Sequence, residues 1–220
     1  RNLRFWKDWL KHGSYDDYWA TINVEERWHE IDVPALNFGG WYDLYAQSTF
    51  INFNGMRQHG MTPQARQSKL IMGPWPHQLS MSTKTGDIDF GVGSMVDLDA
   101  LDIRWFDYWL KGIDNGILDE PPLRIFIMGI NEWRDEHEWP LARTDWQKWY
   151  LHSGGSANSV MGNGVLSPQE LCDQQPDSYI YDPQFPVQTL GGNNCCSPDI
   201  VAWGPYDQRP VEARNDVLCY

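Results

Sequence analysis

Apolar residues in the first half of the chain come in short runs separated by a longer mixed segment. Residues 31–38 (IDVPALNF) and 68–72 (SKLIM) are rich in apolar side chains, as expected of strands buried in a parallel sheet. Between them, residues 44–59 have apolar positions at rough helical spacing and stop at Gly60. The pattern predicts a strand, a helix and a strand, which together form the β-α-β unit of an α/β sheet.

The strongest helical pattern spans residues 94–112. Leu98, Leu101 and Trp105 mark one apolar face, aspartates stand near the start, and Gly112 suits the end. We expect this face to pack on the sheet.

The second half has a different character. After a turn-rich stretch at 113–122, short runs rich in β-branched and aromatic residues alternate with clusters of Gly, Pro, Asn and Ser. These runs are residues 123–128, 147–152, 178–181 and 216–220. They predict a β-sandwich, with a domain boundary near residues 119–122 and a division into residues 1–120 and 121–220. Because the last run stops at Tyr220 without a following strand, we expect the sandwich to be cut off there.

Composition and charge narrow the class of protein. The 220 residues suit one large domain or two small ones, and 41% hydrophobic residues with 21% charged residues describe a folded, soluble chain. The formal charge is 17 − 30 = −13, which disfavours binding to nucleic acid or to an anionic membrane. No apolar run approaches the roughly 20 residues of a membrane span.

The start of the chain and its cysteines do not determine the cellular location of the protein. The sequence opens at Arg1 on an amphipathic segment without the apolar stretch of a signal peptide, as if it began inside a longer protein. Four cysteines, two of them adjacent at Cys195 and Cys196, form no zinc motif and no disulfide framework. Cytoplasmic and secreted or periplasmic locations both remain open, as do the disulfide state and a homo-oligomeric assembly.

Two residues stand where α/β proteins place their chemistry. Asp43 follows the first predicted strand and Gly39-Gly40, and His77 follows the second strand in Gly73-Pro74-Trp75-Pro76-His77. Loops at the carboxyl ends of parallel strands hold reactive groups, so the pair can act as an acid that orients a general base. The alternative remains that Asp43 only caps a helix and His77 only lies in a loop.

A nucleophile for this pair is missing. Hydrolases of the α/β class carry Ser, Asp and His in that order along the chain, with the serine in a G-x-S-x-G turn. Asp43 before His77 fits the last two members, but no such pentapeptide occurs in the 220 residues. We therefore expect the serine to precede residue 1, or to lie on another chain of a processed enzyme.

The motifs around this pair resemble those of a known family. Residues 33–43 (VPALNFGGWYD) and 73–77 (GPWPH) resemble the group of cocaine esterases, X-Pro dipeptidyl-peptidases and α-amino acid ester hydrolases, called CocE/NonD hydrolases. Four further motifs carry the likeness across nearly the whole chain. They are residues 104–112 (RWFDYWLKG), 128–134 (MGINEWR), 181–183 (YDP) and 207–212 (DQRPVE).

The resemblance implies a fold and an activity. The fold is α/β plus all-β: the C-terminal part of an α/β-hydrolase domain, including the return from a helical cap, followed by a jelly-roll-like β-sandwich, truncated at both ends. It implies a serine hydrolase that cleaves small ester, amide or X-Pro peptide substrates through an acyl-enzyme, with no cofactor and no metal. Asp43 would be the triad acid and His77 the base, while an N-terminal hydrolase segment would supply the serine and the oxyanion hole.

Aromatic residues leave two interpretations open. Trp41, Tyr42 and Trp75 flank the candidate pair and suit either the wall of a substrate pocket or packing beneath the loops. Tryptophans of the second half, among them Trp133 and Trp149, suit packing or a carbohydrate-binding surface. The rival hypothesis is therefore a non-catalytic ligand-binding protein in which the hydrolase segment is a relic.

Overall fold

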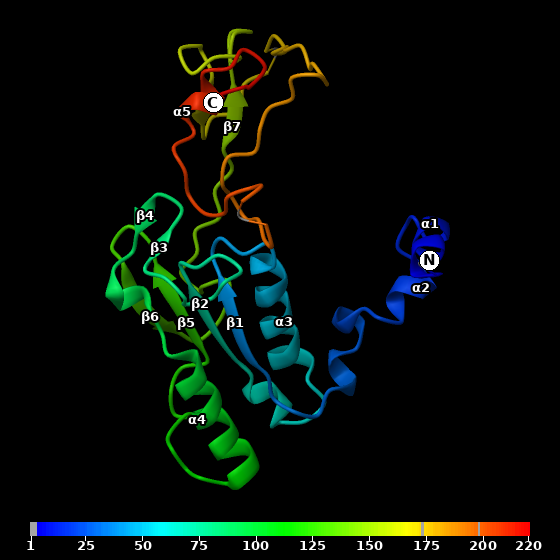
Figure 1. Ribbon diagram of the computed structural model, residues 1–220, viewed down its shortest axis with the longest axis vertical. Coiled ribbons are helices and arrows are strands. Elements are labelled where there is room, and N and C mark those ends of the chain that lie inside the picture. The colour runs from blue at the N-terminus through cyan, green and yellow to red at the C-terminus, as the bar shows by residue number, and fades with distance from the viewer. Residues whose placement is uncertain (1–3, 173, 198) are drawn as a thin grey trace.

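Four strands of the protein form one mixed sheet, and three of them run in the same direction. The computed structural model describes residues 4–172, 174–197 and 199–220. In it, β1 (Leu36–Gly40), β2 (Lys69–Gly73) and β5 (Leu123–Ile127) pair in parallel, and β6 (Glu132–Glu136) pairs antiparallel to β5, in the order β1-β2-β5-β6 (Figure 1). The predicted α/β sheet is present.

The core lies between this sheet and α3 (Ala46–His59), the helix that connects β1 to β2. Phe53 of α3 is fully buried with Leu70, Met72 and Leu123 of the sheet. All five residues of β2 are buried, which explains why its sequence lacks the alternation of a half-exposed strand. The strand predicted over residues 31–38 begins later, at Leu36.

The helix predicted over residues 94–112 is α4 (Leu98–Lys111), but its packing differs from the expectation. The side chain of Asp97 caps its start, and Gly112 ends it in the left-handed conformation with φ of 68°. The helix continues below the lower ends of the strands instead of lying across the sheet (Figure 1). The turn-rich segment that follows folds back along the helix and is held there by two hydrogen bonds between Arg104 and Asn115. The side chain of Phe106 on the same helix is exposed.

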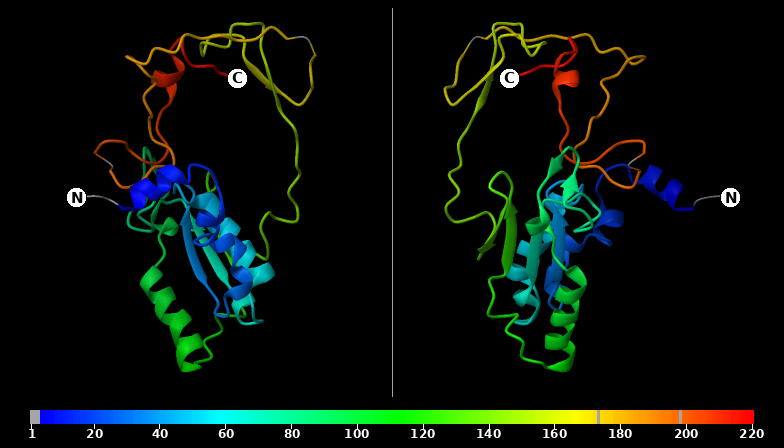
Figure 2. Two further views of the ribbon diagram at one scale, coloured as in Figure 1. Left: turned by 90° about the vertical axis from the view of Figure 1, so that its right-hand side faces the viewer. Right: turned by 60° about the vertical axis from the view of Figure 1, so that its left-hand side comes forward.

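The predicted boundary at residues 120 and 121 falls directly before a strand of the first sheet. Because β5 pairs with β2, residues 123–136 extend the α/β sheet in this structure. Beyond them the chain rises away from the sheet in long irregular segments and comes back to it near residue 193 (Figure 2).

The second half forms less regular structure than its pattern predicts. Its small antiparallel sheet consists of β7 (Tyr150–His152) and β8 (Val165–Ser167), and α5 (Arg209–Glu212) is one short turn. Residues 178–181 and 216–220 are irregular where strands were predicted. Alternating apolar residues favour a strand only where a neighbouring strand accepts its hydrogen bonds, and these segments have no such neighbour in the described residues.

The remaining elements are short. Helices near the start, a β-hairpin after β2 and, among the described residues, four 3-10 turns connect the main elements. They are α1 (Arg4–Lys11), α2 (Asp17–Ala20), β3 (Lys84–Thr85), β4 (Ile88–Asp89), η1 (Val24–Glu26), η2 (Trp28–Glu30), η3 (Ala65–Gln67) and η4 (Val92–Ser94). None of the helices in the described part of the chain combines the length and the apolar character needed to cross a membrane.

One carboxylate ties the C-terminus to the rest of the second half. Asp177 accepts hydrogen bonds from the hydroxyls of Ser153 and Tyr220 and from the backbone N–H of Ala157. The bonds from Ser153, then from Tyr220 and Ala157, lower the pKa of this carboxyl below its usual value. Asp177 therefore joins three segments of a region that has few strand pairs.

Replacing Phe53 by alanine is expected to destabilise the protein by about 3–5 kcal/mol, because the fully buried ring leaves a cavity between α3 and the sheet. Denaturant unfolding measures this loss. Ile103→Ala on α4, where the side chain is 62% exposed, serves as the control and should change the free energy of unfolding by no more than about 0.5 kcal/mol. Equal losses would contradict the assigned core.

Asp177→Asn is expected to lower the melting temperature at neutral pH. A lowered folded-state pKa means that the carboxylate stabilises the fold above the pKa of an unfolded aspartate, about 4. That contribution disappears as the pH falls through the lowered folded-state value, so the melting curves of the two proteins should converge in acid. Asp119→Asn, at an exposed side chain, is the control. A difference in melting temperature between Asp177→Asn and the wild-type protein that persists at low pH would refute this role.

Candidate active site

The parallel pairing of β1 and β2 brings their carboxyl ends together. Gly40, the last residue of β1, stands opposite Gly73, the last residue of β2. The two turns that follow are also joined: the backbone N–H of Trp41 donates to the carbonyl of Gly73 at 2.9 Å, and that of Tyr42 donates to the carbonyl of Trp75 at 3.1 Å. The residues carried by these turns are therefore held side by side.

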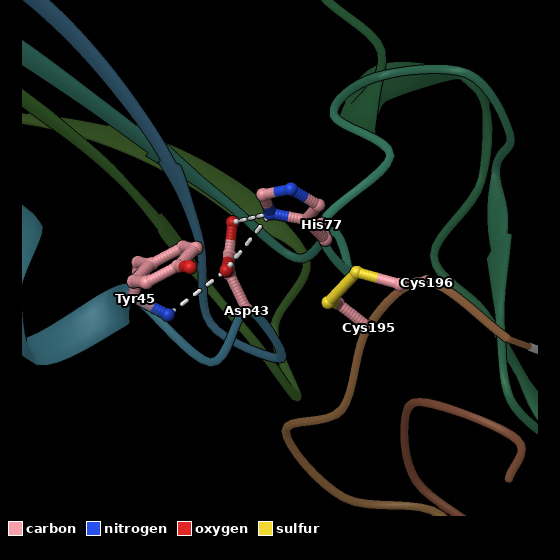
Figure 3. Close-up of a disulfide and its surroundings, with 5 residues drawn as sticks. All are labelled: Asp43, Tyr45, His77, Cys195 and Cys196. Atoms are coloured by element: carbon pink, nitrogen blue, oxygen red, sulfur yellow. Dashed lines mark hydrogen bonds and ion pairs between the residues drawn. A yellow bond between two sulfur atoms is a disulfide. The ribbon is translucent and has the colours of Figure 1, made fainter. Parts of the chain in front are cut away.

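Asp43 and His77 meet at this point. Nδ1 of His77 lies 3.2 Å from Oδ1 and 3.1 Å from Oδ2 of Asp43. The carboxylate is 8% exposed and the imidazole 44% exposed, so the pair has a buried and an accessible end. The other ring nitrogen, Nε2, points away from Asp43 (Figure 3). A carboxylate in this position fixes the ring and leaves Nε2 as the nitrogen that can take up a proton.

The backbone around Asp43 holds its carboxylate in place. Oδ1 also accepts the N–H of Tyr45 at 2.9 Å, and the ring of Tyr45 lies 5.6 Å from that of His77. The capping alternative is wrong for this side chain, because the N-cap of α3 is Tyr45 and the Asp43 carboxylate accepts an N–H from the turn before the helix. The same side chain also contacts the histidine, so both interactions occur together.

A glycine at position 40 allows the two turns to approach. A Cβ at Gly40 would lie 2.1 Å from the carbonyl oxygen of Trp75 and 3.1 Å from that of Pro76, the residue before His77. Both are backbone atoms, which cannot rotate aside as the end of a flexible side chain can. Gly40 therefore permits a contact between backbones as well as ending a strand.

The three aromatic residues that flank the pair differ in exposure. Trp75 is 1% exposed and donates its indole N–H to the carbonyl of Ser94 at 3.1 Å, so it packs beneath the turn. Trp41 is half-buried and donates to the carbonyl of Phe126 at 2.8 Å. Tyr42 is half-buried as well, and burial raises the pKa of its hydroxyl. Trp41 and Tyr42 retain exposed surface near the pair.

A segment from the far end of the sequence completes the surroundings. Asn193 donates from Nδ2 to the carbonyls of Trp41 and Asp43, both at 3.0 Å. Cys195 and Cys196 form a disulfide between adjacent residues, which Figure 3 draws together with Asp43 and His77. The sequence leaves the disulfide state of these two cysteines open, and the structure pairs them. These contacts could not be found by sequence reasoning, because no motif relates positions 150 residues apart.

The two serines that follow His77 most closely among the buried or half-buried ones, Ser80 and Ser94, bond to backbone carbonyls. In the described residues, His77 makes its side-chain hydrogen bonds to Asp43, and the nearby Ser80 donates its hydroxyl to the carbonyl of Val96 at 2.7 Å. Ser94 is fully buried and bonds the carbonyl of Gly91. The accessible face of His77 thus has no serine nucleophile from the described residues.

Comparisons with known proteins match two parts of the chain to family models. Residues 1–79 match the family model of the X-Pro dipeptidyl-peptidase (S15 family), and residues 115–220 match that of the X-Pro dipeptidyl-peptidase C-terminal non-catalytic domain. The cocaine esterase of Rhodococcus sp. (strain MB1 Bresler) is 34% identical over 214 residues, which are 96% of this chain and 36% of that protein.

A solved structure shares the fold. The crystal structure of an aminopeptidase from a marine sediment Thaumarchaeota archaeon superposes with a TM-score of 0.66 at 21% identity, over 98% of this chain and 35% of that chain. The 220 residues therefore span about a third of the length of these relatives.

Gly40→Ala is expected to destabilise the protein by at least about 1–3 kcal/mol and to separate the turns that hold Asp43 and His77, because the new methyl group would overlap backbone atoms. Denaturant unfolding gives the first quantity, and side-chain NMR of His77 follows the second. The matched control is Gly13→Ala, since a Cβ there meets nothing within 4 Å. If both variants behave alike, the close approach at Gly40 is unimportant.

Proposed function

Because this chain belongs to the CocE/NonD and X-Pro dipeptidyl-peptidase (S15) family of hydrolases, we propose that Asp43 and His77 are the acid and base of a Ser-His-Asp triad. One observation carries the proposal: Nδ1 of His77 faces both oxygens of a buried carboxylate while Nε2 is left accessible. This is the arrangement that a general base needs at a serine nucleophile.

The proposed chemistry is acyl transfer in two steps. Nε2 of His77 takes the proton of a serine hydroxyl as its oxygen attacks the carbonyl carbon of an ester or amide. The resulting imidazolium, stabilised by Asp43 at Nδ1, gives that proton to the departing alcohol or amine, and an acyl-enzyme remains. Water then repeats the sequence and releases the acid. The 220 residues contain no G-x-S-x-G turn, so we assign the serine to a segment outside them.

The substrates we propose are small acyl esters, α-amino acid esters or X-Pro peptides. Trp41 and Tyr42 would contribute to the wall of the acyl site from the turn that carries Asp43, and the buried Trp75 would support that turn from below. We further propose that residues 1–120 end the hydrolase domain and that residues 121–220 form a jelly-roll-like C-terminal domain in the complete enzyme, with β5 and β6 joining the two.

The carbohydrate-binding alternative has less support from the structure. Trp133 donates its indole N–H to the carbonyl of Gly93 and packs on Phe126 at a ring distance of 5.2 Å. Trp139 stacks on Phe50 at 4.2 Å. Trp133 and Trp139 are therefore engaged in packing, whereas Trp149 is 57% exposed.

Asp43→Asn and His77→Ala in the complete enzyme are expected to lower kcat by about 10⁴-fold, because each removes a member of a unit that acts together. Circular dichroism should show an unchanged fold. His29→Gln, at a side chain that is 70% exposed, is the control and should hydrolyse a chromogenic acyl ester at the wild-type rate. Full activity of His77→Ala would exclude the triad.

Labelling with a fluorophosphonate, followed by mass analysis under denaturing conditions, should locate the nucleophile. We expect label on a polypeptide that contains these peptides and is heavier than 25.6 kDa, or on a separate chain that copurifies with it. Label within the 220 residues would place the serine inside this chain, and absence of label would favour the ligand-binding hypothesis.

A further inference from the structure

The most unusual feature outside the candidate pair is the segment of residues 191–196, which returns from the second half to the turn that carries Asp43. Its contact with that turn is made by Asn193, whose amide donates to the carbonyls of Trp41 and Asp43 at 3.0 Å each. These are the residues at the start and end of the three-residue stretch Trp41-Tyr42-Asp43, so one side chain bridges the whole turn.

The turn depends on such bonds because it is neither strand nor helix. Its N–H groups donate to the end of β2, to the neighbouring turn and to the end of β1, and the carbonyl of Asp43 also accepts the N–H of Ala46 at the start of α3. Asn193 adds a second donor to that carbonyl and a donor to the carbonyl of Trp41. The position of the Asp43 backbone, and hence of its carboxylate relative to His77, is thus set partly from the distant segment.

The segment keeps its shape through covalent and backbone constraints. Gly192 exchanges two backbone hydrogen bonds with Gly204, and Asn194 donates its side-chain amide to the carbonyls of Gly191 and Ala202. The disulfide between Cys195 and Cys196 closes a small ring on the backbone itself. Within it, Cys196 has φ of 78°, a left-handed conformation that a residue with a Cβ adopts rarely.

We propose that Asn193 is a positioning residue for the Asp43–His77 pair and that reduction of the adjacent Cys195–Cys196 disulfide releases it, which makes the site sensitive to thiols. This inference rests on the proposed triad. A dithiol supplies the two electrons: one of its thiolates attacks a cysteine sulfur and breaks the S–S bond. The second thiolate closes the reagent's own disulfide, and the two cysteine sulfurs take up protons as thiols.

The direction of the effect follows from the backbone. With the ring open, Cys196 is free to leave the left-handed region, which side chains disfavour. Residues 193–196 then have more conformations available, and the fraction of time in which Asn193 reaches both carbonyls falls. The His77–Asp43 contact loosens as a result, although neither residue has been changed.

Asn193 is tested with two variants in the complete enzyme. Asn193→Ala removes the side chain, whereas Asn193→Asp keeps its shape but cannot donate to a carbonyl. Both should lower kcat about tenfold with little change in KM, the factor that corresponds to losing one or two neutral hydrogen bonds. Both should also weaken the low-field NMR signal of the His77 Nδ1 proton, which reports its bond to Asp43. A rise in KM with kcat unchanged would overturn the positioning role and indicate a pocket wall.

The disulfide is tested on a background that carries Cys172→Ser and Cys219→Ser, so that the free cysteines do not react. We expect dithiothreitol to lower kcat about tenfold in this background and oxidation to restore it. A further variant with Cys195→Ser and Cys196→Ser should show the lowered kcat from the start and no response to dithiothreitol. An equal response in that variant, or no response in the background, would overturn the redox part of the proposal.

The outcomes also separate this inference from the function on which it rests. Loss of turnover in His77→Ala together with wild-type behaviour of both Asn193 variants would leave the triad intact and reject the positioning role. Full turnover in His77→Ala would reject the triad itself, and the Asn193 measurements would then show whether its contact matters to the His77 Nδ1 proton at all.

Discussion

The close approach of two backbones at the ends of β1 and β2 is the constraint on which the rest of the site depends. Gly40 stands opposite Gly73 in the parallel register, and a side chain at Gly40 would overlap the carbonyl of Trp75. Only with this spacing can the turn after β1 donate its N–H groups to the turn after β2. Asp43 and His77 both extend from these joined turns, and Asn193 bonds to the first of them.

Much of this arrangement could be predicted from the sequence because it is encoded locally. Strand ends followed by Gly-rich turns placed Asp43 and His77 at the same edge of the sheet, and the end of α4 could be read from its capping glycine. The motifs shared with the hydrolase family extended the prediction to the whole chain. The catalytic roles of the two residues remain predictions that the geometry supports.

Sequence reasoning was weaker where the outcome depends on distant partners. The hydrogen bond from Asn193 to Asp43 joins residues 150 positions apart, and no sequence motif predicts a contact between an asparagine and a turn at that distance. The burial of Trp75 depends on the carbonyl of Ser94 and on the ring of Trp133, neither of which its own motif shows. Residues 178–181 failed as a strand for the same reason, because a strand requires a partner as well as a pattern.

The contact between residues 191–196 and the turn of residues 41–43 couples the stability of the two halves of the chain. A contact that holds the Asp43 turn also holds the segment that makes it, so order in one half and order in the other are thermodynamically linked. Any interaction that orders the turn, such as the contact between Asp43 and His77, stabilises the distant segment by the same coupling free energy, and loosening that segment weakens this contact to an equal degree. The second half, which carries neither Asp43 nor His77, thereby contributes to the order of the turn that holds Asp43 against His77.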